Sequence, residues 1–249
     1  NGIVSPANDI ETINTELALA DLDTVEKKLQ RAEKMSRSGD RKAREEVEFY
    51  LRVRGILENV QKLRGAAQSE DERIWLRDLH LLADKPVLYV ANVTEDDLEG
   101  NHPNVAQVRE IAASEGAGVV VICGKLEAEI AELDGSEKQA YHEDMGLPEA
   151  GLDRLIRNGY ALLGLITYFT AGVKEVRAWT IVNGTKAPQA AGVIHTDFEK
   201  GFIRAEVIGF DDYITCNGES GAKEKGLMRL EGKEYVVKDG DVMHFRFNV

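Results

Sequence analysis

The sequence predicts an α/β protein in which paired helices, a parallel β-α-β unit and a small mixed β-sheet module follow one another. Three patterns support this order. Residues 8–82 repeat apolar side chains every three or four positions, which is typical of amphipathic helices. Two continuous apolar runs flank a helical segment between residues 87 and 122. From residue 167 onward the runs are short, alternating and punctuated by glycine. At 249 residues, the chain can hold one large or two modest domains.

The first predicted helix covers residues 8–34, where Asn8 and Glu11 form a capping-box pattern. A second apolar stripe, at residues 47–60, follows a turn in which Asp40 is the expected helix cap. Two amphipathic helices joined by a short glycine turn predict an antiparallel helical hairpin.

A cap at Ser69 predicts a third helix that runs to Leu82. Beyond it, residues 87–91 form an apolar run that suits a strand covered on both faces of a parallel sheet. A predicted helix at 104–115 and a second strand at 119–122 follow, so these two strands should be parallel.

Helical patterns fill residues 136–144 and 151–164, and strands dominate thereafter. Asn183-Gly184 predicts a hairpin turn and 238–241 a tight turn. The predicted strands of this module are 176–181, 192–195, 203–207, 234–237 and 242–247.

The formal net charge of the chain is −13 at pH 7. This excess of negative charge argues against binding of DNA or another polyanion by the whole surface. The acidic residues are unevenly distributed. Residues 1–170 contain 20 Lys and Arg and 32 Asp and Glu. Residues 171–249 contain 11 Lys and Arg and 12 Asp and Glu. The last third could therefore meet a phosphate backbone locally.

Cys123 and Cys216 lie far apart, without a zinc-binding pattern, which indicates reduced thiols in a cytoplasmic setting. A redox role for Cys123 competes with the simpler interpretation of a buried inert thiol. No apolar run reaches the length of a membrane span, so no membrane partner is expected.

A polar turn, Asn92-Val93-Thr94-Glu95, follows the first strand. Ligands in open α/β sheets bind beyond the carboxyl ends of the strands, so an amide and a carboxylate here could read the edge of a purine base. Thr94 or Asp96 could equally just begin the next segment.

Residues 118–126 resemble a phosphate-binding P-loop only superficially. The motif needs four residues between its glycines and a Ser or Thr after the lysine, whereas five residues and Leu126 occur here. Cys123-Gly124-Lys125 instead forms the tip of the second strand. Its backbone could face the same base, or it could be a plain strand-to-helix turn.

The histidines of the C-terminal module give little support for a metal site. His195 and Asp197 could form a pair, but no third ligand is evident in the sequence, so no metal is expected there. His244 alternates with apolar neighbours on the final predicted strand, which predicts a surface or half-buried strand residue.

Several long sequence stretches of this chain resemble the YchF-type Obg-like ATPases. The similarity runs from about residue 3 to the end. It rests on the Asn92–Glu95 turn and on NDIETINTELALADLDTVEKKLQ (8–30), TYFTAGVKEVRAWTI (167–181), KAPQAAGVIHTDFEKGFIRAEVI (186–208) and DGDVMHFRFNV (239–249).

This resemblance implies a partial P-loop-type α/β nucleotide domain with an inserted α-helical hairpin, followed by a C-terminal α+β β-grasp domain of the TGS type. The implied boundaries are 1–20 with 84–164 for the nucleotide domain, 21–83 for the hairpin, and 165–249 for the TGS-like domain. The family pattern starts with a P-loop, two switch segments and Mg²⁺ ligands, which these residues lack. The chain is therefore expected to be part of a longer protein.

By resemblance, Asn92, Val93 and Glu95 would line the base pocket, with Val93 packed against the ring. GTPases carry Asn-Lys-x-Asp at this turn, so Val93 stands in place of Lys and Glu95 in place of Asp. The exchange suits adenine, which lacks the 2-amino group of guanine. Cys123, Gly124 and Lys125 match the neighbouring loop less closely.

The resemblance further implies an ATPase that prefers ATP over GTP, uses Mg²⁺ in the intact protein and associates with the ribosome or its RNA. No catalytic residue is expected among these 249, so the chain alone is expected to be inactive. The alternative is a non-catalytic ribosome- or RNA-interaction module. Candidate RNA contacts are Lys174, Arg177, Lys186, Lys200 and Arg204, although exposed basic residues are usually only solvated.

Overall fold

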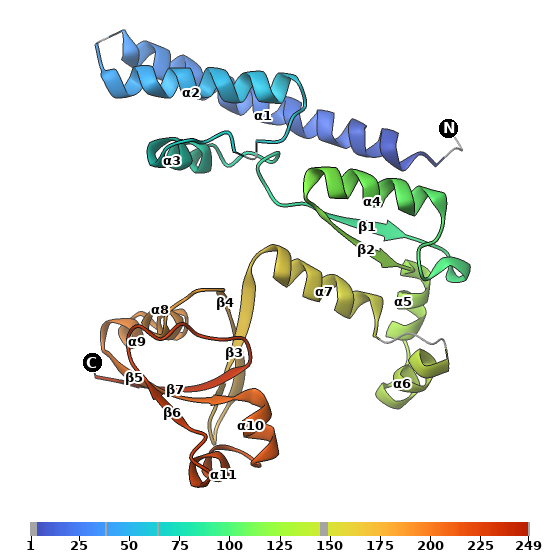
Figure 1. Cartoon of the computed structure of the whole chain (residues 1–249), viewed down its shortest axis with the longest axis vertical. Coiled ribbons are helices and arrows are strands. Elements are labelled where there is room, and N and C mark those ends of the chain that lie inside the picture. The colour runs from blue at the N-terminus through green and yellow to red at the C-terminus, as the bar shows by residue number, and fades with distance from the viewer. Residues whose placement is uncertain (1–3, 38, 64, 145–148, 249) are drawn as a thin grey trace. The chain divides into compact units, whose positions relative to one another are not determined.

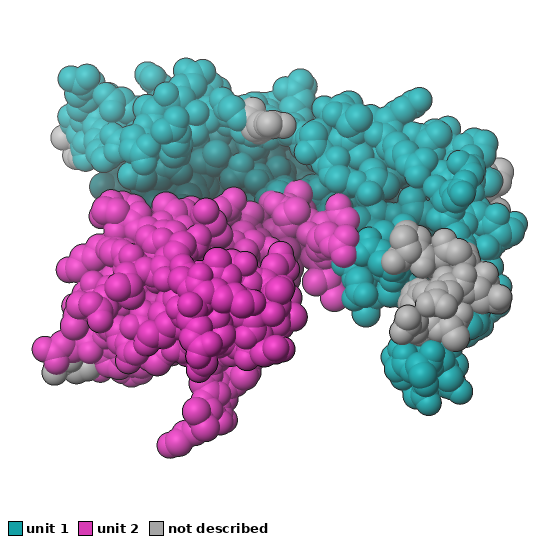
Figure 2. Space-filling model, turned by 60° about the horizontal axis from the view of Figure 1, so that its bottom comes forward, with its two compact units in different colours: residues 1–154 teal, residues 155–249 magenta. Residues whose placement is uncertain are grey.

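The computed structural model describes residues 4–37, 39–63, 65–144 and 149–248. The chain divides into two compact units, residues 1–154 and 155–249 (Figure 2). In the described part, no helix is both long and apolar enough to cross a membrane.

Two long helices, α1 (Pro6–Ser36) and α2 (Arg41–Glu58), lie along one another in the first unit (Figure 1). They share a core in which Val25, Phe49 and Val53 are fully buried. Asp40 caps α2 as expected, because its carboxylate accepts from the N–H groups of Lys42 and Ala43.

The predicted cap of the first helix is wrong. Helix α1 begins at Pro6, with Ser5 at the N-cap, so Asn8 and Glu11 lie within the helix. A proline fits the first helical position because that residue's N–H would have no partner in the helix.

The third helix, α3 (Glu70–Leu79), begins as predicted: Ser69 Oγ accepts from Glu72 N–H at 3.2 Å. It ends before Leu82, because His80 adopts a left-handed backbone with φ 51°. The chain that follows is fixed by Asp21, a 3% exposed residue of α1. Its carboxylate accepts from the N–H groups of Leu82 and Ala83 at 2.8 and 2.7 Å.

The β-α-β prediction is confirmed. Strands β1 (Leu88–Asn92) and β2 (Gly118–Ile122) are parallel and joined by α4 (Pro103–Glu115). β1 lies one residue later than predicted, so Asn92 is its last residue and pairs with Ile122. A short 3₁₀ helix, η1 (Glu95–Asp97), follows the turn.

Three helices continue from β2: α5 (Gly124–Ala131), α6 (Gly135–Asp144) and α7 (Gly151–Leu162). Glu127 anchors the start of α7, because its Oε1 accepts from Gly151 N–H at 2.7 Å. Arg154 Nη2 also donates to the carbonyl of Val121 at 3.1 Å. Helices α6 and α7 correspond to the predicted helices at 136–144 and 151–164, although α7 ends two residues earlier than predicted.

The second unit is built on a five-stranded sheet with the order β4-β3-β7-β5-β6. β3 is parallel to β7, and the other neighbouring pairs are antiparallel. The strands are β3 (Leu165–Ala171), β4 (Val176–Val182), β5 (Phe202–Gly209), β6 (Arg229–Glu231) and β7 (Asp241–Phe247).

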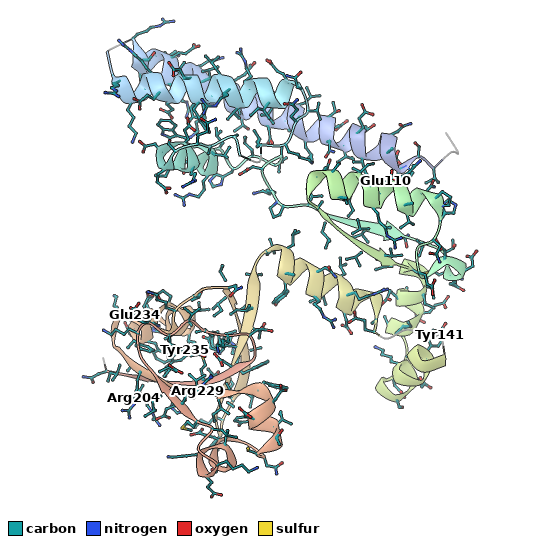
Figure 3. The ribbon with its side chains drawn as sticks, in the orientation of Figure 1. Glu110, Tyr141, Arg204, Arg229, Glu234 and Tyr235 are labelled. Carbon is teal, nitrogen blue, oxygen red and sulfur yellow. The ribbon has the colours of Figure 1, made fainter. Side chains whose placement is uncertain are left out.

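Four short helices complete this unit: α8 (Ala187–Ile194), α9 (Thr196–Lys200), α10 (Phe210–Thr215) and α11 (Glu219–Glu224). Helix α8 packs on one face of the sheet, where Ala190 joins Tyr168 and Phe245 in a buried core. A buried carboxylate, Asp241, accepts from Tyr235 Oη at 2.7 Å and from Arg229 at 3.2 Å. Tyr235 and Arg229 are labelled in Figure 3.

Three strand-and-turn predictions for this unit are wrong. Residues 192–195 end helix α8, because the alanines at 187, 190 and 191 form a buried helical stripe. Residues 234–237 form only an isolated bridge, Lys186 to Val236. Asn183-Gly184 links β4 to α8 and does not join two strands. The 238–241 turn is confirmed by the bond from Asp241 N–H to the Lys238 carbonyl.

Candidate functional site

The carboxyl ends of β1 and β2 lie side by side and bring two loops together. Val93 N–H donates to the carbonyl of Ile122 at 2.8 Å. The side-chain oxygen of Asn92 accepts from Gly124 N–H at 2.9 Å. Gly124 is the first residue of α5, whose first N–H groups have no partner within the helix. Asn92 therefore fixes the turn after β1 to the start of the helix after β2.

Glu95 and Lys125 form an ion pair across these two loops. Lys125 Nζ lies 2.7 Å from Glu95 Oε1 and 3.8 Å from Glu129 Oε1. Hydrogen bonding to Glu95 raises the pKa of Lys125 above its ordinary value. The side chains remain accessible, at 44% for Glu95 and 72% for Lys125. A hydrogen-bond acceptor and a cationic donor thus stand next to each other at the sheet edge.

Cys123 faces the interior of this region, and Val93 is only partly buried there. Cys123 is 4% exposed and packs with Leu126 and Ile130, and Val93 is half-buried against the same cluster. The thiol is therefore buried, in agreement with the simpler interpretation.

A hollow of about 400 Å³ lies on the other side of the Asn92–Thr94 turn. It is lined by β1, the start of α1 and the facing side of α4, including Asn92, Val93, Thr94, Asp96, Asn104 and Val108. Glu95 is not among its lining residues, because its carboxylate is directed to Lys125. The carboxylate is thus neither sealed in the interior nor inside the hollow.

The sequence indicates Lys125 only as a residue of the neighbouring loop and does not predict its pairing with Glu95. The two residues are 30 positions apart, and no local pattern links them. Glu127, whose carboxylate holds the start of α7, is likewise not predicted from the sequence. The predicted parallel pairing of the two strands was the one signal for the Glu95–Lys125 pair, because it places the carboxyl ends of both strands side by side.

The five candidate RNA contacts are exposed but do not form one patch. Arg177 pairs with Thr170, two residues from the buried Tyr168, and so points to the helix-covered face of the sheet. Its guanidinium stacks 4.2 Å above the Trp179 ring. Arg204 precedes the buried Ala205 and so points to the opposite face (Figure 3).

The other basic candidates lie on separate elements. Lys186 precedes α8 and pairs with Glu234 at 2.7 Å. Lys174 lies in the turn between β3 and β4, and Lys200 ends α9. His195 caps α9, because its Nδ1 accepts from Asp197 N–H at 3.2 Å.

Comparison with known proteins gives consistent matches. The family YchF-GTPase_C, described as "Protein of unknown function (DUF933)", matches residues 165–248. The ribosome-binding ATPase YchF of Haemophilus ducreyi is 56% identical over 248 residues, which cover 100% of this chain and 68% of that protein. The protein of the same name from Escherichia coli O157:H7 is 57% identical over 249 residues, with the same coverage.

Solved structures agree with these matches. The YchF GTPase of Schizosaccharomyces pombe superposes with a TM-score of 0.85 at 34% identity, covering 99% of this chain and 67% of that one. A GTP-binding protein from Pyrococcus horikoshii shares the fold, with a TM-score of 0.62 at 15% identity.

Proposed function

Because this chain belongs to the YchF family, we propose that the edge formed by the Asn92–Glu95 turn and the Cys123–Lys125 loop recognises the adenine base of ATP. The observation that carries the proposal is the hydrogen bond from Gly124 to Asn92, which holds the two loops together beside an accessible carboxylate. Relatives that match the whole chain are named as ATPases, which supports ATP as the ligand.

The chemistry of the edge suits adenine. Glu95 supplies an acceptor for the 6-amino group, and the Lys125 ammonium supplies a donor for a ring nitrogen. Val93 would pack against the ring, and the backbone at Cys123 and Gly124 would close the pocket. Guanine presents an acceptor in place of the 6-amino group, so we expect it to bind more weakly.

We further propose the domain arrangement 1–20 with 84–164 as base-recognition domain, 21–83 as helical hairpin and 165–249 as TGS-like β-grasp domain. These 249 residues contain no P-loop motif. Phosphoryl transfer depends on positioning and charge stabilisation by such a loop and Mg²⁺. We therefore expect these residues alone to bind ATP only weakly, through its base, and to hydrolyse none. We also propose a cytoplasmic location.

Ribosome association is the second part of the proposal, supported by the names of the relatives. Within the C-terminal unit, 12 basic and 12 acidic residues balance, so this unit repels RNA less than the acidic first unit. The Arg177–Trp179 stack offers a flat cationic surface of the kind that bases stack on. A ribosome-binding module that needs no nucleotide is the alternative function.

Equilibrium binding of ATP to the 249-residue chain tests the base site. Glu95→Ala should weaken ATP binding roughly tenfold or more, because a charged hydrogen-bond acceptor is lost. Glu99→Ala removes an equal charge four residues away and should leave the affinity unchanged. Equal effects of the two variants would refute base recognition by Glu95.

Cosedimentation with ribosomal subunits separates the two functions. If ATP alters the amount of wild-type chain bound and Asn92→Ala abolishes that dependence, the nucleotide function is supported. Nucleotide-independent binding that Trp179→Ala weakens favours the interaction module.

A further inference from the structure

A histidine and two glutamates converge on the face of the C-terminal sheet opposite α8. His244 of β7 and Glu206 of β5 are direct cross-strand partners. Both alternate with buried core residues, so they point away from that core. Glu219, the first residue of α11, approaches the same point. One ligand atom from each of the three side chains lies within 4.8 Å of the other two.

The three side chains share a small hollow. Glu206, Glu219 and His244 all line it, and Tyr213, Met228 and Met243 contribute its less polar walls. Among the described residues, no other group of three or more His, Cys, Asp or Glu side chains converges in this way. The three ligands come from two strands and a helix that the fold holds together, so their convergence does not depend on one mobile segment.

The chemistry of the cluster matches a transition-metal dication. One imidazole nitrogen and two carboxylate oxygens form a mixed donor set that zinc accepts at about 2.0–2.2 Å. Tetrahedral ligands at such bond lengths lie roughly 3.3–3.6 Å apart. The three ligand atoms lie within 4.8 Å of one another, which is at most about 1.5 Å more than this spacing. Rotation of the exposed Glu219 and His244 side chains can close that difference.

Arg246 orients one of these three ligands, Glu206, through two hydrogen bonds. Its Nε and Nη2 donate to the two oxygens of Glu206 at 3.2 and 2.9 Å. The two hydrogen bonds hold the Glu206 carboxylate in one orientation. Each carboxylate oxygen has a second lone pair, so Glu206 can bind a cation while Arg246 orients it.

We propose that Glu206, Glu219 and His244 bind a divalent transition-metal ion, for which zinc is the probe. Three protein ligands leave one coordination position open to water. The ion would fix the start of α11 to the two central strands of the sheet. The site lies wholly in the C-terminal unit and does not depend on the proposed base recognition.

The test is titration of the 249-residue chain with ZnCl₂, followed by calorimetry. We expect saturable binding of one zinc ion per chain. Glu219→Gln, which preserves size and shape, and His244→Ala should each lower the affinity about tenfold or more. Circular dichroism checks that each variant is folded, and a given zinc concentration should raise the thermal midpoint of the wild type more than that of either site variant.

The matched control is His195→Ala, which removes another exposed histidine that lies beside a carboxylate. It should bind zinc like the wild type. The proposal is overturned if zinc shows no saturable binding. It is equally overturned if Glu219→Gln and His244→Ala bind zinc unchanged, or if His195→Ala loses binding to the same extent.

Discussion

The side-chain oxygen of Asn92 accepts a hydrogen bond from Gly124 N–H at 2.9 Å, although the two residues are 32 positions apart. This bond joins the end of β1 to the first N–H of α5. It makes one continuous edge from two loops, and Glu95 and Lys125 stand on that edge. The proposed base site therefore depends on this bond.

Replacement of Asn92 by alanine should loosen the edge. Because Gly124 N–H loses its partner, the free energy of unfolding should fall by about 1 kcal/mol in urea titrations. Asn92→Asp keeps the acceptor and should retain most of the stability. Asn101→Ala, at an exposed position outside this contact, serves as control. An alanine variant as stable as wild type would show that the bond does not hold the loops together.

Asp21 should be a main stabilising residue of the first unit. It is 3% exposed and accepts from two backbone N–H groups, which Asp21→Ala would leave without partners. We expect a loss of about 2–3 kcal/mol in the free energy of unfolding. A Trp179→Phe background lets Trp75 report on this unit alone, since Trp75 packs in its core.

The control for Asp21 is Asp23→Ala. Asp23 is 68% exposed and pairs with Lys27 one turn along the helix, so its loss should cost about 0.5 kcal/mol or less. If Asp21→Ala cost no more than Asp23→Ala, the anchoring role of Asp21 would be excluded.

Stability should fall in alkali as tyrosines ionise. Burial, with a hydrogen bond to Glu115, raises the pKa of Tyr89 to about 12 from its ordinary value of 10.0. Between these values the unfolded chain loses the proton while the folded chain keeps it, so unfolding becomes more favourable as pH rises. Below pH 10 the contribution of Tyr89 is fully present.

Urea unfolding at pH 8, 10 and 11 tests this prediction. Tyr89→Phe cannot ionise, so its stability should fall less steeply above pH 10 than that of the wild type. A residual slope should remain, since burial also raises the pKa of Tyr50 and Tyr168. Identical slopes for wild type and variant would contradict the assignment.

Gly201 should tolerate no side chain. A Cβ atom there would lie 2.0 Å from the backbone oxygen of Asn248, which pairs with this residue at the end of the chain. Gly201→Ala should therefore cost about 1–3 kcal/mol, read from Trp179 fluorescence in a Trp75→Phe background. Gly232→Ala, where nothing lies within 4 Å, should be nearly neutral. Equal stabilities would show that the contact relaxes freely.

Local sequence patterns predicted much of the fold. The β-α-β unit was predictable because buried parallel strands are continuous apolar runs and Gly116 ends α4 in a left-handed conformation. Residues 192–195 were misread because Val193 and Ile194 favour strands in isolation. The alanine spacing upstream, together with Pro188 in the first turn, was the helix signal.

The candidate site was predictable only in part. The position of Asn92 at a strand end follows from sequence, because the strand ends where polarity begins. Its bond to Gly124, the Glu95–Lys125 ion pair and the cluster around His244 all join residues far apart in the chain. Such contacts depend on strand order and register, which no local periodicity specifies.

Amide chemical-shift mapping of the 249-residue chain with ATP and GTP tests the central proposal most directly. We predict that ATP shifts the amides of residues 92–95 and 123–125 first, that GTP shifts them less at equal concentration, and that Asn92→Ala abolishes the response. Shifts confined to other residues, or equal responses to both nucleotides that persist in Asn92→Ala, would contradict base recognition at this edge.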